Sequence, residues 1–194
     1  MVSTRHMGGA RRTLVVALIF LGSLAACATN SVSSQSKAHA TVAGCAATTA
    51  ATTQDALARR ACAAIGNQAQ AVRTSYNAHD ASVHITVTIG GAVPLTSQQI
   101  SAAQELTKAL SLREERAMWT SGVSLKDVKV TVMGPTQDEY ANIVAQPYGV
   151  AMLDAPTAAR FDWASLSADS AWDRFDGVYL RPTFDVVDDV PAAP

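Results

Sequence analysis

The sequence lacks the motifs that identify most nucleotide-binding and hydrolytic enzymes. After residue 26 it has no phosphate-binding loop, no dinucleotide-binding fingerprint, no Gly-x-Ser-x-Gly motif and no zinc-ligand spacing. An excess of basic residues is also absent, with 15 Lys and Arg against 16 Asp and Glu. A nucleic-acid-binding protein normally shows a basic face. We therefore expect no nucleic-acid partner, no cofactor and no metal.

Long apolar runs are absent too, and the one strongly apolar segment is short. It extends from Leu14 to Leu21 and follows three arginines in a stretch without acidic residues. A membrane-spanning helix needs about 20 apolar residues. A basic start, a short apolar middle and small residues at the end are instead typical of a cleaved secretory signal. We predict that residues 1–26 are a signal peptide.

The predicted signal ends in Leu24, Ala25, Ala26 and Cys27, which resembles the lipobox of bacterial lipoprotein precursors. In that family a leucine stands three residues before the cysteine, with small residues between them. The resemblance implies cleavage before Cys27 and a diacylglycerol anchor on its sulfur, with fatty acyl chains such as palmitate. It also implies attachment to the extracytoplasmic side of a bacterial cell membrane. The alternative is an ordinary signal peptide cut nearby, with Cys27 a plain thiol.

The segment after the signal is predicted to be a tether. Residues 27–52 are mainly Ala, Thr and Ser with almost no charge, so they cannot bury enough surface to offset the entropy cost of ordering. We expect a flexible segment with a root-mean-square span of about 25–30 Å. Without residues 1–26 the chain has 12 basic and 16 acidic side chains, a formal charge near −4. This charge argues against a polybasic patch that binds anionic lipid, so we expect the lipid on Cys27 alone to attach the protein to the membrane.

Two cysteines remain once Cys27 is assigned to lipid. Disulfides persist in exported proteins, and an even number of remaining cysteines favours a bridge. We therefore predict a Cys45–Cys62 disulfide, which is worth about 3 kcal/mol in the chain-entropy model. The alternative is two unpaired thiols, one on the tether and one buried on a helix.

The first part of the predicted domain reads as a helix followed by a β-hairpin. A helix is expected over residues 53–65, ended by Gly66-Asn67. A weaker strand over 68–76 and a turn follow. Strict alternation of β-branched residues over 83–89 then predicts a strand with one buried face.

A second helix and strand complete the predicted core. Thr96 and Gln99 have capping-box spacing. The apolar residues that follow at helical spacing are Ile100, Ala103, Leu106, Leu110, Ala117 and Met118. Alternating valines over 128–132 predict the last strand of this core. We predict a single α+β domain over residues 53–185, with a small antiparallel sheet, helices packed on one face and a frayed tail over 186–194.

The order helix, strand, strand, helix, strand, with Gly122-Val123 shortly before the last strand, resembles the BON domain of bacterial envelope proteins. The resemblance covers under half of the chain and consists of this topology and the one dipeptide. The hairpin lacks the glycine-centred turn and short spacing of that family, so no residue role is carried over. The resemblance implies a fold and no function.

The remaining segment has weaker patterns. Thr136 and Glu139 predict a capped short helix that runs to Val144, and residues 148–152 predict a further strand. Aromatic residues between 161 and 184 are expected to cover the open face or edge of the sheet. The alternative is that they line a groove for a partner or an apolar ligand.

Two groups of residues have side chains suited to catalysis or metal binding. His79, Asp80 and His84 cluster around one predicted turn, and we interpret them as turn and solvent-facing residues. The second group consists of aspartates in the C-terminal part: Asp162, Asp169, Asp173, Asp176, Asp185, Asp188 and Asp189. Their spacing does not fit an EF-hand, and surface aspartates are expected on an acidic domain.

These observations predict a lipid-anchored cell-envelope protein that acts as a binding or structural module. Its partner would be an unknown envelope protein or small ligand, besides the membrane reached through Cys27. The rival hypothesis is an envelope hydrolase that uses the Asp-rich C-terminal part with His79 or His84. The two differ in whether carboxylates and a histidine converge in one cleft.

Overall fold

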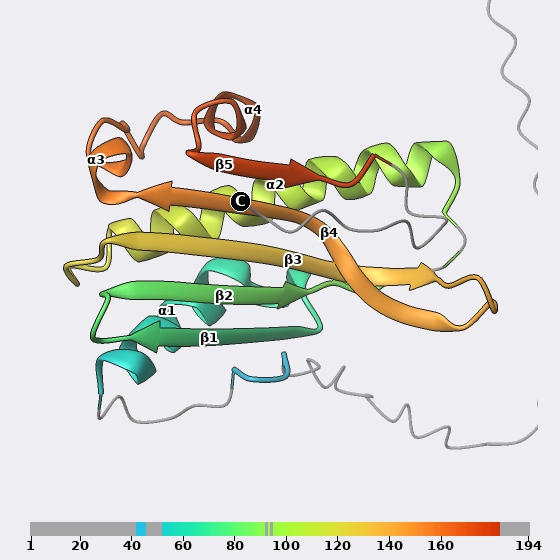
Figure 1. Cartoon of the computed structure of the whole chain (residues 1–194), viewed down its shortest axis with the longest axis horizontal. Coiled ribbons are helices and arrows are strands. Elements are labelled where there is room, and N and C mark those ends of the chain that lie inside the picture. The colour runs from blue at the N-terminus through green and yellow to red at the C-terminus, as the bar shows by residue number, and fades with distance from the viewer. Residues whose placement is uncertain (1–41, 46–51, 92, 94, 183–194) are drawn as a thin grey trace, which may run out of the picture. The chain divides into compact units, whose positions relative to one another are not determined.

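The computed structural model describes residues 42–45, 52–91, 93 and 95–182 (Figure 1). The chain divides into two units, Met1–Ala38 and His39–Pro194, and every described residue belongs to the second. The predicted signal peptide, Cys27, most of the predicted tether and the predicted frayed tail lie outside the described residues.

Two long helices form where periodicity predicted them. Helix α1 spans Thr53–Ile65 and helix α2 spans Ser97–Trp119. Both begin with a capping box. A threonine side chain accepts a hydrogen bond from the backbone N–H three residues later, and the side chain of that later residue accepts one from the backbone N–H of the threonine. Gly66 ends α1 with a φ of 57°, a conformation that favours glycine.

Five strands form one sheet in the order of the chain, β1-β2-β3-β4-β5. They are β1 (Ala71–Asn77), β2 (Ser82–Thr88), β3 (Asp127–Gln137), β4 (Ile143–Asp154) and β5 (Gly177–Leu180). The α+β class is confirmed, but the sheet is mixed, because β2 and β3 are parallel while the other pairs are antiparallel. Helix α2 runs back along the sheet between β2 and β3, and such a crossover makes the strands that it joins parallel.

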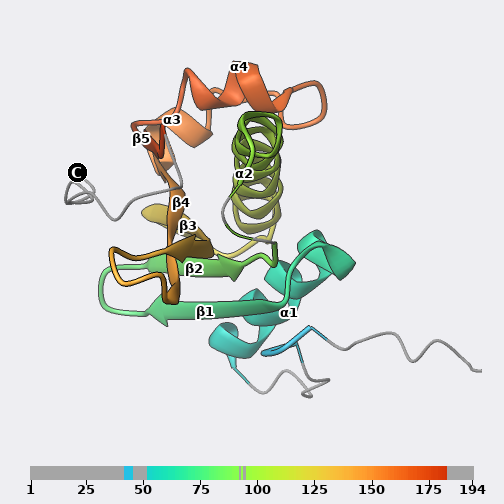
Figure 2. The same ribbon diagram turned by 90° about the vertical axis from the view of Figure 1, so that its right-hand side faces the viewer.

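Both long helices lie on one face of the sheet (Figure 2). The core between the helices and the sheet contains the alternating residues of β2 and β3, namely Val83, Ile85, Val87, Val128, Val130 and Val132, together with Leu57 of α1 and Leu110 of α2. The predicted buried face of the strand over 83–89 is confirmed, with Ile85 fully buried, whereas Leu106 of the predicted apolar stripe is only partly buried. The helix layer on one face is therefore as predicted.

The C-terminal aromatic residues extend the helix layer. Two short helices, α3 (Ala155–Ala158) and α4 (Ala168–Trp172), precede β5. Trp172 and Phe175 pack with Ala151 and Leu153 of β4, beside Leu112 of α2. These aromatic residues therefore lie on the helix side of the sheet.

The helix predicted between Thr136 and Val144 is wrong. Strands β3 and β4 continue through this segment as a long hairpin. Asp138 stabilises the turn at its end, since its carboxylate accepts hydrogen bonds from the backbone N–H groups of Tyr140 and Asn142 at 3.0 and 2.7 Å. This side-chain cap satisfies the same groups that a helix would otherwise pair. The strand predicted over 148–152 is present as part of the longer β4.

No helix in the described part of the chain is both long enough and apolar enough to span a membrane.

Candidate functional site

The predicted Cys45–Cys62 disulfide is present and joins the segment Val42–Cys45 to helix α1. Hydrogen bonds of 2.9 Å also join the Ala43 backbone to those of Gln70 and Val72 at the outer edge of β1. Gly44 has a φ of 87°, and a Cβ there would lie 2.1 Å from the Val72 carbonyl oxygen. The described end of the predicted tether is therefore fastened to the domain by a covalent bond, by β pairing and by a contact that only glycine permits.

The face of the sheet opposite α1 and α2 has a shallow hollow of about 310 Å³, which we call the basin. Four strands contribute its lining residues: Ser75, Asn77, Ser82, Val83, His84, Asp127, Lys129 and Met152. These side chains meet because β2 and β3 pair in register, which places His84 beside Lys129 and Ser82 beside Asp127. The basin therefore brings together hydroxyl, amide, imidazole, ammonium and carboxylate groups.

His84 is the central titratable group of the basin. It is exposed on the polar side of β2, as the alternation predicted. Partial burial is the main cause that lowers its pKa from 6.5, the Lys129 ammonium lowers it further, and the Asp127 carboxylate opposes both. His84 is therefore neutral at pH 7, so its ring offers one hydrogen-bond donor and one acceptor. This chemistry suits recognition of a polar group.

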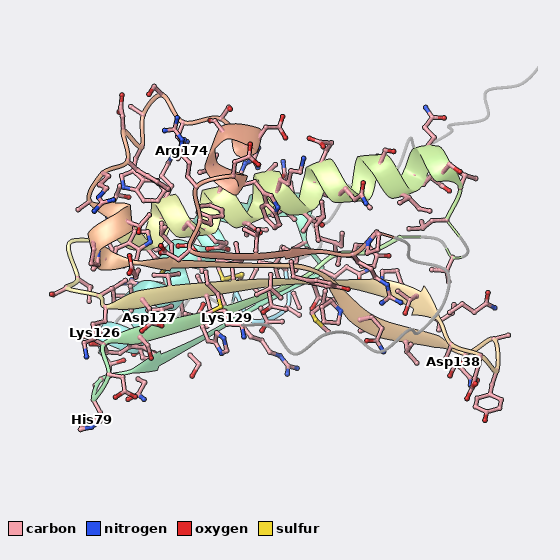
Figure 3. The ribbon with its side chains drawn as sticks, turned by 45° about the horizontal axis from the view of Figure 1, so that its top comes forward. His79, Lys126, Asp127, Lys129, Asp138 and Arg174 are labelled. Atoms are coloured by element: carbon pink, nitrogen blue, oxygen red, sulfur yellow. A yellow bond between two sulfur atoms is a disulfide. The ribbon has the colours of Figure 1, made fainter. Side chains whose placement is uncertain are left out.

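His79 lies outside the basin, in the turn between β1 and β2, at the opposite end of the sheet from Asp138 (Figure 3). Its side chain is 93% exposed, and its Nε2 is 3.9 Å from Asp80 Oδ1. Asp80 also accepts a hydrogen bond from the Asn77 side chain within the turn. The structure therefore places His79 and Asp80 as solvated turn residues and separates them from His84.

The described C-terminal aspartates make local structural contacts. Asp176 accepts hydrogen bonds from the Asp154 N–H and the Thr157 hydroxyl, both at 2.7 Å. Asp169 pairs with Lys108 of α2 at 2.9 Å, and Asp162 accepts from the hydroxyl of a nearby serine. These contacts lie away from the basin, whose lining includes only Asp127 among the acidic residues.

The remaining aspartates add no described site. Asp173 is exposed on the surface next to α4. Asp185, Asp188 and Asp189 lie outside the described residues. Among the described residues, no cluster of three or more His, Cys, Asp or Glu side chains is arranged to hold a metal ion. In this part of the chain the C-terminal carboxylates and the two histidines do not converge.

A pair of buried carboxyl groups was missed from the sequence. Glu114 and Glu115 on α2 are both fully buried. Both oxygens of Glu114 and one of Glu115 lack a hydrogen-bond partner among the described residues. The other oxygen of Glu115 accepts from the Trp119 indole N–H at 2.9 Å. Glu114 lies midway between Leu110 and Met118, so its place within the predicted apolar stripe was the signal.

Burial dominates the electrostatics of this pair. It raises the pKa of Glu114 to about 9. Burial also raises the pKa of Glu115 well above 4.5, against the lowering effect of the Trp119 hydrogen bond, and the carboxyl groups of Glu114, Asp176 and Asp127 raise it further. An uncharged carboxyl group costs far less to bury than a carboxylate. Glu114 is therefore protonated at neutral pH, burial also favours the protonated form of Glu115, and neither carboxyl group lies at the surface.

No protein-family model, curated protein or solved structure matches this chain. The resemblances to lipoprotein precursors and to the BON domain therefore stay predictions.

Proposed function

We propose that this protein is a lipid-anchored cell-envelope protein that acts as a binding module, with the basin as its binding surface. The observation that carries the proposal is the way the chain enters the domain, through a segment bridged to α1 by Cys45–Cys62. A disulfide at that position suits a compartment outside the cytoplasm. The disulfide also suits a tether, because it links the segment that follows the predicted anchor at Cys27 covalently to α1 and does not depend on packing.

The chemistry of the basin favours a polar partner. Lys129 and Asp127 offer opposite charges, and neutral His84 offers both a donor and an acceptor. A volume of about 310 Å³ is at the lower limit for small-molecule sites. We therefore infer that the basin binds a hydroxyl- or charge-bearing group of an envelope component, and that the remaining open face contacts the rest of that component.

The anchor is tested by the Cys27→Ser variant. Because the sulfur is the predicted point of lipid attachment, the variant should leave the membrane fraction and partition into the aqueous phase of a detergent extraction. The wild-type protein should partition into the detergent phase. Equal partitioning of the two proteins would sink the proposal of a lipid anchor.

The binding surface is tested by photo-crosslinking in intact cells. A photoreactive residue at Ser82 reports on the basin, and one at the exposed Arg59 of α1 is the matched control on the helix side. We expect a discrete crosslinked product from position 82 that is lost when His84→Ala and Lys129→Ala are added. A product that forms only from position 59 would move the binding surface to the helices.

A further inference from the structure

The hairpin of β3 and β4 extends beyond the rest of the sheet. Strand β3 pairs with β2 only as far as Met133, and β4 pairs with β5 only from Gly149 onward. Residues 134–146, which we call the arm, form strand pairs only with each other in the part of the chain that the structure describes. Figure 1 shows the arm at one end of the molecule, past the ends of β1 and β2.

The end of the arm carries the most exposed large apolar side chains among the described residues. Tyr140 is 78% exposed and Ile143 is 70% exposed. An apolar hollow of about 190 Å³ extends along the arm, from Ile89 and Pro135 near its base to Ile143 near its end. A single exposed apolar residue needs no explanation. Here, however, the exposed Tyr140 and Ile143 and the apolar hollow lie together on one hairpin and form a continuous apolar surface.

The arm is held by specific contacts at both ends. At its base, the Tyr148 hydroxyl donates a hydrogen bond to the Pro135 carbonyl oxygen. The Tyr148 ring packs against Gly134 so closely that a Cβ on residue 134 would lie only 2.4 Å from the nearest ring carbons. At its tip, the Asp138 carboxylate binds two backbone N–H groups and the Asn142 side chain. Tyr140 and Ile143 are therefore presented outward by a stabilised turn.

The described end of the tether lies at the same end of the sheet as the arm. Ala43 pairs with Ala71, which pairs with Thr88, which in turn lies beside Met133 at the base of the arm. The pairing of Ala43 with β1 is parallel, so Val42 is the end of this segment nearer to the arm.

The length of chain before Val42 sets how far the domain can lie from the predicted anchor. Fifteen peptide steps separate Cys27 from Val42. A flexible chain of this length has a root-mean-square span of about 20 Å and a maximum reach of about 50 Å. A lipid on Cys27 would therefore hold the end of the domain that carries the arm close to the bilayer.

We propose that the tip of the arm is a second membrane contact, in which Tyr140 and Ile143 enter the interfacial region of the bilayer that carries the lipid. This inference rests on the proposed lipid anchor. Tyrosine suits this depth, because its ring is apolar while its hydroxyl remains hydrated. Asp138 and Glu139 make the tip acidic, so attraction to anionic lipid does not contribute and apolar burial must supply the contact.

The contact depends on the tether for its strength. Two side chains bury little area, so the arm alone binds a bilayer weakly. A short linker to the lipid raises the effective concentration of the tip at the surface and makes the same contact intramolecular. Two points of attachment at one end would orient the domain, with the turn that carries His79 directed away from the membrane (Figure 3).

The test uses the full lipidated protein in vesicles of zwitterionic phosphatidylcholine. Ala141→Cys places a thiol in the tip without removing Tyr140 or Ile143, and Ala78→Cys is a matched control in the exposed turn at the opposite end. Each added thiol is labelled with a polarity-sensitive fluorophore. We expect aqueous-quencher access to the label at position 141 to fall at least about threefold relative to position 78, and the double substitution Tyr140→Ser/Ile143→Ser to restore it.

Other outcomes overturn the inference in distinguishable ways. Equal quencher access at both positions, in protein that sediments with the vesicles, would refute the contact and leave the anchor standing. Failure of the protein to sediment would refute the anchor as well. Shielding of position 141 in native membranes but not in protein-free vesicles would show that the tip contacts a protein and not lipid.

Discussion

The buried Glu114 predicts a folded state that loses stability as the pH rises. The side chain is fully buried, and neither carboxyl oxygen has a hydrogen-bond partner among the described residues. Burial raises its pKa from the ordinary 4.5 to about 9. Between these values the folded protein keeps a proton that the unfolded chain releases. The stability contributed by this proton is fully present below pH 4.5 and is lost progressively up to pH 9.

The magnitude follows from the width of that range. Each pH unit changes the free energy of unfolding by about 1.4 kcal/mol per carboxyl group. From pH 4.5 to pH 7, Glu114 alone is therefore expected to remove about 3 kcal/mol. Burial also raises the pKa of Glu115, so this group lowers the free energy of unfolding in the same direction as the pH rises. Domains have a total stability of only about 5–15 kcal/mol, so this loss should be easily measured.

The assay is urea unfolding of wild-type protein and Glu114→Gln from pH 5 to pH 9. Glutamine keeps the shape of the side chain and cannot ionise. The two proteins should differ little at pH 5, and the variant should be the more stable by about 3 kcal/mol at pH 7. Exposed groups such as Asp138, with a lowered pKa, and the shifted His84 affect both proteins alike and cancel.

A difference between the two proteins that does not change with pH would refute this reasoning. It would mean that Glu114 is ionised in the folded state and has a partner that compensates its charge. A matched control is Glu105→Gln on the same helix, because Glu105 is exposed and pairs with Lys108 at the surface. Because this control keeps Glu114, its free energy of unfolding should fall with rising pH as that of the wild-type protein does.

Three further predictions concern the framework that holds the sites. Gly134→Ala should destabilise the protein by about 1–3 kcal/mol in thermal or urea unfolding, because the new Cβ would overlap the buried Tyr148 ring. An unchanged unfolding midpoint would show that the base of the arm can open freely. Mass spectrometry without reductant should show two hydrogens fewer than the dithiol, and reducing Cys45–Cys62 should cost about 3 kcal/mol. Ile85→Ala should cost about 2–5 kcal/mol and His84→Ala within about 0.5 kcal/mol, whereas equal costs would contradict the one-sided burial of β2.

Local signals in the sequence predicted the parts of the fold that depend on local chemistry. The capping box of Thr96 and Gln99 marked the start of α2, and alternation over 83–89 gave the buried face of β2 correctly. The capping box is an interaction between residues close in the chain, and the alternation follows from the two-residue period of a strand. The Cys45–Cys62 bridge was predictable because two cysteines remain once Cys27 is assigned to the predicted lipid anchor.

Features that depend on distant contacts were not predictable from these patterns. The parallel pairing of β2 with β3 is set by the path of α2, which periodicity does not reveal. The capping pattern of Thr136 and Glu139 was overridden by the hairpin, in which Thr136 is buried. The basin was also missed as a site, because the strand register alone brings Lys129 of β3 beside His84 of β2.

The most direct test of the central claim is mass spectrometry of the native protein after extraction from its membrane with detergent. We predict a mature chain that begins at Cys27, with a diacylglycerol on the Cys27 sulfur and the Cys45–Cys62 bridge intact. A mature protein that begins elsewhere, or that carries Cys27 as an unmodified thiol, would contradict the account.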